Sequence, residues 1–426
     1  MRWLHTFLFS LTLISSPAMG AYAQETAIAD AHAREGDDLR VWLVTAGPGD
    51  AVWERYGHNA IRVENTRTGR DISYNWGIFD FAQIDFIPRF LQGRMLYRME
   101  VFPTAAMVDG YARANREVVL QELDLTPAQK IELRELADAN ARPGNRDYLY
   151  QYFTDNCSTR VRDLLDEVLD GMLRSAFKQV ETGRTYRDNT RRLTQVDPLI
   201  YTGMDFLLGT PTDAAITVWE EMFLPLALRD ELRGISIADG AGRSRPLVIA
   251  EETVEANRAE EPNAAPRWLV IYLIVGLILG GTLSAVGADR ERTATLLRGG
   301  VVAIAVAWVM LGGVLGLILV LLLFTDHAFA SWNENLFLFN PILLALGVVL
   351  PFASARPACL PYARGLSLTI AGVGVLGLLW QIVPASQHQN AMFFAVALPA
   401  HVGLAWGLHV SGRLEAGTAS GQRGSC

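Results

Sequence analysis

This sequence lacks the features that mark nucleic-acid, metal and phosphate binding. The chain has 426 residues, with 37 Lys and Arg against 45 Asp and Glu and a formal net charge of −8. No run rich in Lys and Arg appears, so the composition gives no support to nucleic-acid binding. A Gly-rich phosphate loop, the H-E-x-x-H and C-x-x-C spacings and internal repeats are also missing, and we predict no metal site and no cofactor.

Cysteine is scarce as well. The three cysteines are Cys157, Cys359 and Cys426. The membrane topology derived below places the last two in the cytoplasm, which leaves Cys157 alone in an oxidising compartment without a partner for an intramolecular disulfide. A solitary exported thiol is either a buried structural residue or a group used in chemistry, and both interpretations stand at this point.

The first residues have the pattern of a secretory signal peptide. A basic start at residues 1–3 is followed by an apolar stretch at 4–14 and by the cleavage pattern Ala21-Tyr22-Ala23. The apolar stretch is too short to span a bilayer. We therefore predict that residues 1–23 are a signal peptide. No cysteine lies near the cleavage point, so the chain is not expected to be a lipoprotein itself.

Composition then changes twice along the chain. Residues 24–250 contain no long apolar run, as expected of one exported globular domain. Residues 251–266 are acidic, contain Ala and Pro, and have the character of a linker. Residues 267–410 predict an all-α domain with five transmembrane segments, at 268–288, 300–324, 336–355, 366–383 and 391–410.

Basic residues fix the orientation of these segments. The positive-inside rule places Lys- and Arg-bearing loops in the cytoplasm. Basic residues occur in the loop after the first segment, in the loop after the third and in the tail at 411–426: Arg290, Arg292, Arg298, Arg356, Arg364, Arg413 and Arg423. Loops 325–335 and 384–390 have none and are predicted to be external. We expect a protein of the bacterial inner (cytoplasmic) membrane with its first domain in the periplasm.

The exported domain has the pattern of an α+β fold. Strand-like alternation or apolar runs occur at 41–46, 57–64, 71–79 and 96–102. Thr126 and Gln129 form a capping box with proline at the first helical position, which predicts a helix to about Ala139. We expect a small antiparallel sheet with a helix beginning near Cys157 packed against it.

Cys157 lies at the start of that helix. Asp155 or Asn156 can cap it. Five apolar residues recur behind the cysteine at helical spacing and predict a buried face: Val161, Leu164, Leu165, Val168 and Leu169. A thiol in the first turn lies near unpaired backbone N–H groups and the positive end of the helix dipole, which favour the thiolate.

A thiolate nucleophile needs a base. After signal cleavage the exported domain keeps His32, in a polar N-terminal segment, and His58, which opens a strand after Gly57. His58 is the imidazole able to serve Cys157, although a sheet-edge histidine has the same pattern. Asn75 on the following strand is our choice to orient the imidazole, where Asp71 and Ser73 share its face and a plain strand-end role is equally open.

Other polar and apolar stretches have two interpretations each. The backbone N–H of Cys157, with the Asn156 side chain, is a candidate oxyanion site. Residues 203–209 and 219–226 predict short apolar helices that either form core or line a lipid groove. The external loop at 325–335 is rich in polar groups, and is either a solvated loop or a polar mouth for a lipid headgroup.

Four stretches of the exported domain resemble a known family. They read YGHNAIRV at 56–63, YNWGIFDF at 74–81, NRDYLYQYF at 145–153 and DNCSTR at 155–160. Together with residues 203–209, residues 223–225 and the external loop through Asn340-Pro341, they make most of the chain similar to the Lnb family. Lnb proteins are lipoprotein N-acyltransferases with a papain-like thiol domain. The order of histidine before cysteine also resembles permuted NlpC-type thiol enzymes, which include the lecithin–retinol acyltransferase group.

The resemblance implies a function as well as a fold. It places the catalytic cysteine and histidine on Cys157 and His58 of a papain-like (permuted NlpC-type) domain. It implies a membrane phospholipid as acyl donor and the N-terminal amine of a lipoprotein as acceptor. The candidate substrate contacts are Tyr56, Asp326, His327, Asn333 and Asn335. Two alternatives remain, a cell-wall amidase or peptidase of the NlpC type and a non-enzymatic membrane receptor or scaffold.

Overall fold

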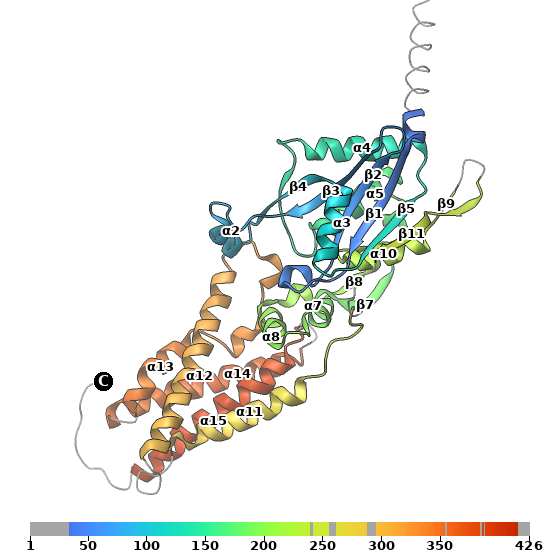
Figure 1. The fold of residues 1–426 in the computed structure, drawn as a ribbon. Coiled ribbons are helices and arrows are strands. Elements are labelled where there is room, and N and C mark those ends of the chain that lie inside the picture. Colours follow the sequence, from blue (N-terminus) through green and yellow to red (C-terminus); the bar gives the residue numbers. More distant parts are fainter. Residues whose placement is uncertain are drawn as a thin grey trace, which may run out of the picture.

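The structure is a computed structural model that describes residues 34–238, 242–254, 261–287, 295–353, 356–383, 386 and 388–415. The predicted signal peptide at residues 1–23 lies outside the described residues. The exported domain and a helical bundle are stacked end to end, with short helices and loops between them (Figure 1).

A seven-stranded sheet forms the centre of the exported domain. All its neighbouring pairs are antiparallel, in the order β11-β5-β1-β2-β3-β4-β6. Its strands are β1 Leu39–Ala46, β2 His58–Asn65, β3 Arg70–Ile78, β4 Leu96–Pro103, β5 Val118–Leu123, β6 Asp147–Leu149 and β11 Val248–Val254. The four strands predicted from the sequence match β1 to β4 within two residues at each end.

Short helices cover the sheet and connect it to the bundle. They are α2 Phe86–Gln92, α3 Thr104–Arg113, α4 Pro127–Ala141, α5 Cys157–Val168, α6 Met172–Phe177, α7 Tyr186–Thr194, α8 Pro198–Leu207, α9 Val218–Glu221 and α10 Pro225–Gly234. Two small sheets pair β7 Glu181–Thr185 with β8 Ala215–Thr217 and β9 Ser236–Ala238 with β10 Ser244–Pro246. The predicted capping box of Thr126 and Gln129 opens α4.

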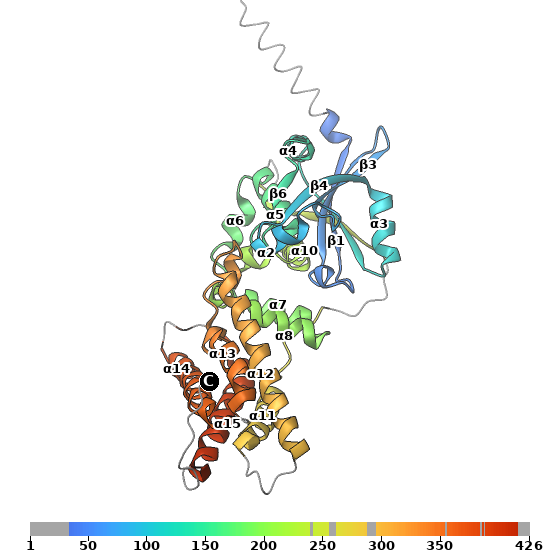
Figure 2. The same ribbon diagram turned by 90° about the vertical axis from the view of Figure 1, so that its left-hand side faces the viewer.

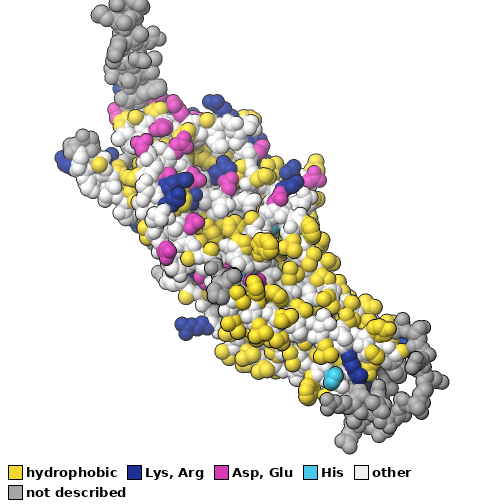
Figure 3. Space-filling view, turned by 180° about the vertical axis from the view of Figure 1, so that it is seen from behind, with side chains coloured by type: hydrophobic (Ala, Val, Ile, Leu, Met, Phe, Trp, Pro, Cys, Tyr) yellow, Lys and Arg dark blue, Asp and Glu magenta, His cyan; other side chains and the backbone are white. Residues whose placement is uncertain are grey.

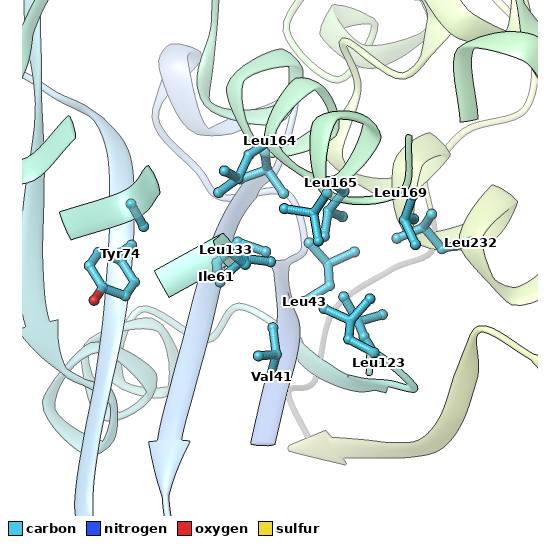
Figure 4. Packing of buried hydrophobic residues seen from close by; sticks show 14 of the residues in the cluster. Val41, Leu43, Ile61, Tyr74, Leu123, Leu133, Leu164, Leu165, Leu169 and Leu232 are labelled. Atoms are coloured by element: carbon cyan, nitrogen blue, oxygen red, sulfur yellow. The ribbon is translucent and has the colours of Figure 1, made fainter. Parts of the chain in front are cut away.

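Helices cover both faces of the sheet. Successive side chains of β1 point to opposite faces, and nearly all of them are therefore buried. Leu43 and Ile61 pack with Leu165 of α5 in the main core, to which α4 and α10 also contribute (Figure 4). Trp42 and Val44 point to the other face and pack with Met107 of α3. Figure 2 shows α3 on one side of the strands and α5 on the other. The domain is α+β, as predicted.

The C-terminal part is a bundle of apolar helices: α11 Leu269–Ser284, α12 Thr295–Leu322, α13 Ile342–Ala353, α14 Leu360–Trp380 and α15 Ala391–Glu415. Four helical stretches are long and apolar enough to cross a membrane, Arg298–Leu322, Ala328–Ala353, Leu360–Trp380 and Ala391–Val410. α11 is apolar but has 16 residues. Five transmembrane segments were predicted. Among the described residues, four helical stretches have the length to cross a membrane.

Close backbone contact holds α11 in the bundle. A Cβ on Gly276 or Gly280 would collide with the α15 backbone between Ala395 and Ala400, and one on Gly403 would collide with Gly280. Small residues at such contacts let membrane helices approach closely. We therefore keep a fifth crossing through α11 as a prediction.

Two boundaries differ from the sequence prediction. β11 pairs with β5 as far as Val254, so its last four residues fall in the range predicted as linker. These residues form the strand because they pair with the backbone N–H and C=O groups at the edge of β5. α15 continues to Glu415 and takes five residues of the predicted tail.

Candidate active site

Cys157 is the first residue of α5, and Asn156 caps that helix. The Asn156 side-chain Oδ1 accepts hydrogen bonds from the backbone N–H groups of Ser158 and Thr159, both at 2.9 Å. A helix leaves its first N–H groups without partners inside the helix. The cap occupies the N–H groups of Ser158 and Thr159, and the described residues supply no acceptor for the N–H of Cys157 beside the thiol.

His58 is the first residue of β2, and Asn75 lies on the neighbouring strand β3. Asn75 is 3% exposed, and its side-chain Oδ1 lies 2.6 Å from His58 Nε2. An amide oxygen only accepts hydrogen bonds, so Nε2 carries the proton that it donates to Asn75. The opposite ring nitrogen, Nδ1, is then the one available to the thiol.

The thiol of Cys157 and the imidazole of His58 are hydrogen-bonded to each other. Burial raises the pKa of Cys157, but the positive charge of His58 and its hydrogen bond outweigh burial and hold that pKa below its ordinary value. Burial lowers the pKa of His58, but the charge of Cys157, its hydrogen bond and the hydrogen bond to Asn75 raise it above its ordinary value. The two shifts favour a thiolate–imidazolium pair.

A buried hydrogen bond fixes the two catalytic candidates relative to each other. Asn59, which follows His58, donates from Nδ2 to the Oγ of Ser158, which follows Cys157, over 3.0 Å. Asn59 also accepts from Thr45, and Ser158 donates to the carbonyl of Met222. Asn59 and Ser158 are fully buried. The first turn of α5 is thus tied to the end of β2 at the residues next to the thiol and the imidazole.

Gly77 leaves space beside the pair. Its φ is +90°, in the left-handed region that favours glycine. A Cβ placed on it would lie 3.4 Å from Cβ of Cys157 and 3.7 Å from Cε1 of His58. The backbone conformation therefore favours glycine, and a larger side chain would fill the space in contact with Cys157 and His58. Gly77 and Asn59 were not predicted from the sequence, although each lies within two residues of a predicted site residue.

Two predicted polar groups are engaged in local structure. The Asn156 side chain uses Oδ1 for the cap and donates from Nδ2 to the carbonyls of Tyr152 and Phe223. It is not free to donate to an oxyanion, so of the predicted oxyanion donors the Cys157 N–H is retained. Tyr56 packs beside Phe153 and Tyr186, where burial raises its pKa to about 12.

The external loop at 325–335 contacts the exported domain through all four predicted residues. Asp326 pairs with Arg94 at 2.6 Å, and His327 Nε2 donates to the carbonyl of Phe90 at 2.8 Å. The amide groups of Asn333 and Asn335 are buried, and both donate to the carbonyl of Phe206 at the end of α8. Their amide donors hold the loop on α8, and Asp326 and His327 are the two predicted loop contacts that are not buried.

Of the two apolar stretches that could have lined a groove, residues 219–226 belong to the core, where Trp219, Met222 and Phe223 are buried. In residues 203–209, Phe206 packs with Phe339 and Phe393 of the bundle, whereas Leu207 is 39% exposed. Among the described residues no group of three or more His, Cys, Asp or Glu side chains is placed to hold a metal ion.

Comparison with known families bears on this domain. Residues 30–192 match the family model of the Lnb N-terminal periplasmic domain. This part of the chain belongs to the Lnb family. The match covers His58, Asn75 and Cys157 and all strands from β1 to β7, so the family predicted from the sequence motifs is confirmed. No curated protein and no solved structure matches the chain. An Lnb periplasmic domain joined to apolar helices of membrane-crossing length makes this a membrane protein with a periplasmic domain.

Proposed function

We propose that this protein is a membrane-anchored thiol acyltransferase that moves an acyl chain from a phospholipid, through a thioester on Cys157, to the N-terminal amine of a lipoprotein. The observation that carries the proposal is the Cys157–His58–Asn75 arrangement at the start of α5. A nucleophile, a base in hydrogen-bond contact with it and a third group that orients the base form the minimal set for covalent acyl transfer.

The first half of the reaction forms the thioester. The Cys157 thiolate attacks the ester carbonyl of the donor, and the backbone N–H of Cys157 stabilises the negative charge on the carbonyl oxygen. The imidazolium of His58 gives its proton to the departing alkoxide of the lysophospholipid. The C–O ester bond breaks, the C–S bond forms, and His58 is left neutral.

The second half uses the neutral imidazole as a base. The acceptor amine attacks the thioester carbonyl, and His58 removes the proton that the amine loses. The C–S bond breaks as the C–N bond forms, and the thiolate and imidazolium are restored. A low pKa of Cys157 makes it a good leaving group in this step as well as a nucleophile in the first.

The attachment of the domain supports lipid substrates. Loop 325–335 and residues 388–390 reach from the bundle onto the exported domain, at Phe206 through Asn333 and at Arg191 through Gln389. The thiol domain is therefore held at the end of the apolar bundle (Figure 1). Donor and acceptor lipids stay in the bilayer, so an enzyme acting on them has to be held at its surface.

Mass spectrometry of the purified full-length chain tests the proposal. After incubation with a phospholipid of defined acyl chains, we expect an acyl adduct on the peptide that contains Cys157, and its discharge when an amine-bearing diacylglyceryl lipopeptide is added. Cys157→Ala should carry no adduct, and His58→Ala should form it at least about a hundredfold more slowly, as expected when a general acid–base group is lost. Turnover of cell-wall muropeptides without any acyl adduct would contradict the proposal.

A further inference from the structure

Six exposed apolar side chains form one surface at the edge of the exported domain. We call them the α2 patch: Trp53, Phe81, Ile84, Ile87, Phe90 and Leu91. Ile84 is 85% exposed, and Ile87 and Leu91 are each 62% exposed. Trp53 joins the patch through its ring contact with Phe81 at 5.3 Å. Apolar patches of this kind on a soluble surface mark contact sites.

The α2 patch lies beside the membrane bundle. The N–H of Asp326 donates to the carbonyl of Gln92 at 2.8 Å, and His327 donates to the carbonyl of Phe90. Asp326 and His327 come shortly after the end of α12 at Leu322, beyond the 83%-exposed Phe324. A Cβ on Gly93 would collide with both loop residues, so the contact is close. The patch is thus fixed at the external end of a helix that is apolar enough to cross the membrane.

The surrounding surface is continuous with that of the bundle. Seen from behind, apolar side chains cover the bundle and extend upward along the right-hand edge of the exported domain (Figure 3). In Figure 1, α2 stands over the end of the bundle on the corresponding side. A bilayer that surrounds the bundle would therefore reach the level of α2 at its outer surface.

A ring of seven aromatic side chains connects this surface to the neighbourhood of Cys157. Its consecutive members are Phe86, Phe79, Tyr97, Tyr150, Tyr152, His327 and Phe90, and Phe90 lies 6.4 Å from Phe86 and closes the ring. The centroid distances around it run from 4.2 to 6.4 Å. No member is fully buried. A pocket of about 120 Å³ opens beside Phe79 and Tyr97, and Asp80, Gln83, Arg98 and Asp147 form its polar side.

The far side of the ring lies near the thiol. Phe79 follows Gly77 by two residues on the same stretch of chain, and Gly77 lies directly beside Cys157 and His58. Burial raises the pKa of Tyr97 to about 12, with a further contribution from the charge of Cys157. The ring therefore spans from the α2 patch and the bundle loop at one side to the catalytic candidates at the other.

We propose that the α2 patch inserts into the external leaflet of the membrane and that the aromatic ring leads the acyl chain of a donor lipid from that leaflet toward Cys157. Trp and Phe side chains suit the membrane interface, and a short amphipathic segment lies in its plane. Asp80 and Asp85 on the same segment are exposed, so the insertion is shallow and keeps their carboxylates at headgroup level. The passage of the acyl chain rests on the proposed function, whereas the insertion does not.

Fluorescence in the full-length chain tests the insertion. A fluorescent amino acid replaces Ile87 in protein reconstituted into phospholipid nanodiscs whose acyl chains carry a quencher. The matched site is Ile249 on β11, which is also apolar and 52% exposed. We expect strong quenching by the lipid quencher at position 87. At position 249 we expect no more quenching than for a fluorophore in water. Equal quenching at the two sites, or a signal at 87 that follows protein concentration and not the lipid quencher, would overturn the insertion and indicate a protein partner.

Acyl transfer tests the passage separately. The double variant Ile87→Asp, Leu91→Asp should form the Cys157 adduct from bilayer phospholipid at least about tenfold more slowly, which corresponds to the loss of about 1.4 kcal/mol. Its rate of Cys157 alkylation by a small soluble reagent should equal that of the wild type, as should all rates of Ile249→Asp. Adduct formation at the wild-type rate would overturn the passage. A wild-type protein without any adduct would overturn the proposed function, and the quenching result would still decide the insertion.

Discussion

At the scale of single residues, each neighbour of the Cys157 thiol makes a different contribution to the candidate site. His58 supplies charge, Asn75 holds its ring, and Gly77 supplies empty space. Each of these contributions can be removed by one substitution. His58 is the first residue of β2, and Asn75 and Gly77 lie in the last four residues of the neighbouring strand β3.

Gly77→Ala is expected to abolish most acyl transfer. The new Cβ would lie in contact with Cys157 and next to His58, in a backbone conformation that costs a non-glycine residue about 1–2 kcal/mol. Gly69 is the matched control, because its φ is +73° and a Cβ on it would meet nothing within 4 Å. Both variants should lose similar stability in thermal unfolding, and only Gly77→Ala should lose adduct formation. Equal activities of the two variants would refute the role of Gly77.

The pH dependence of Cys157 follows from the direction of the two pKa shifts. The thiolate is kept to a lower pH than in an ordinary cysteine, and the imidazolium to a higher pH than in an ordinary histidine. Thioester formation should rise with pH as Cys157 ionises and fall as His58 loses its proton. In His58→Ala, burial acts on the thiol without the opposing charge, so the alkylation of Cys157 should shift to higher pH.

Asn75→Ala should move the alkaline side of this profile to lower pH. The hydrogen bond from His58 to Asn75 raises the pKa of His58, so its loss releases the proton earlier. Asp71→Ala is the matched control on the same strand, because Asp71 pairs with Arg62 and has no contact with the imidazole in the described structure. A profile that shifts in Asp71→Ala and not in Asn75→Ala would contradict the orienting role of Asn75. The measurement is the rate of adduct formation against pH.

At the scale of elements, the start of α5 is the decisive piece. The Asn156 cap orders the first turn, and leaves the Cys157 N–H open at the positive end of the helix. The same side chain joins α5 to the backbone at Tyr152 and Phe223. Helix, thiol and oxyanion site are therefore positioned by one amide.

Asn156→Ala is predicted to cost about 2 kcal/mol of stability, from the lost cap and from the two carbonyls left without a donor. Its Cys157 should also alkylate more slowly at neutral pH, because the helix start is no longer ordered around the thiol. Thr126→Ala removes the cap of α4 and should cost about 1 kcal/mol without changing the alkylation rate. Denaturant unfolding in detergent and alkylation kinetics measure the two effects. An unchanged thiol in Asn156→Ala would contradict this assignment.

At the scale of the whole molecule, a buried polar cluster joins the exported domain to the bundle. Arg187 is fully buried and pairs with Asp213 at 2.6 Å and with Asp205 at 2.9 Å. His388 of an external loop lies 3.3 Å from Asp213. Burial lowers the pKa of His388, which is therefore neutral at pH 7, and Asp213 keeps its charge. The cluster couples α7 and the end of α8 to the loop before α15.

Arg187→Met should destabilise the protein by about 3–5 kcal/mol, because it leaves buried carboxylates without their partner. The exported domain should then be cleaved from the bundle by protease at lower concentration than in the wild type. Arg67→Met removes an exposed pair with Asp38 and should change stability by less than about 1 kcal/mol. Equal stability of the two variants would show that the cluster does not hold the domains together.

Local patterns were sufficient for much of the fold and part of the site. Strands β1 to β4, the box of Thr126 and the helix start at Cys157 follow from side-chain alternation and capping, which act over a few residues. His58 followed from the small number of histidines. The sequence could not show that Asn156 and Asn333 use their amides on backbone carbonyls, because these partners lie 67 and 127 residues away.

The sequence by itself determined strands β1 to β4, the starts of α4 and α5 and the apolar character of the C-terminal part. Hydrophobic periodicity, charge in the loops and residue counts are properties of the chain before it folds. Only the tertiary structure decided which groups contact the thiol and that Gly77, which has no side chain, lies beside it. It also decided that α2 lies at the end of α12, beside the ring of seven aromatic side chains. Those facts depend on contacts between distant segments, and a one-dimensional pattern does not specify such contacts.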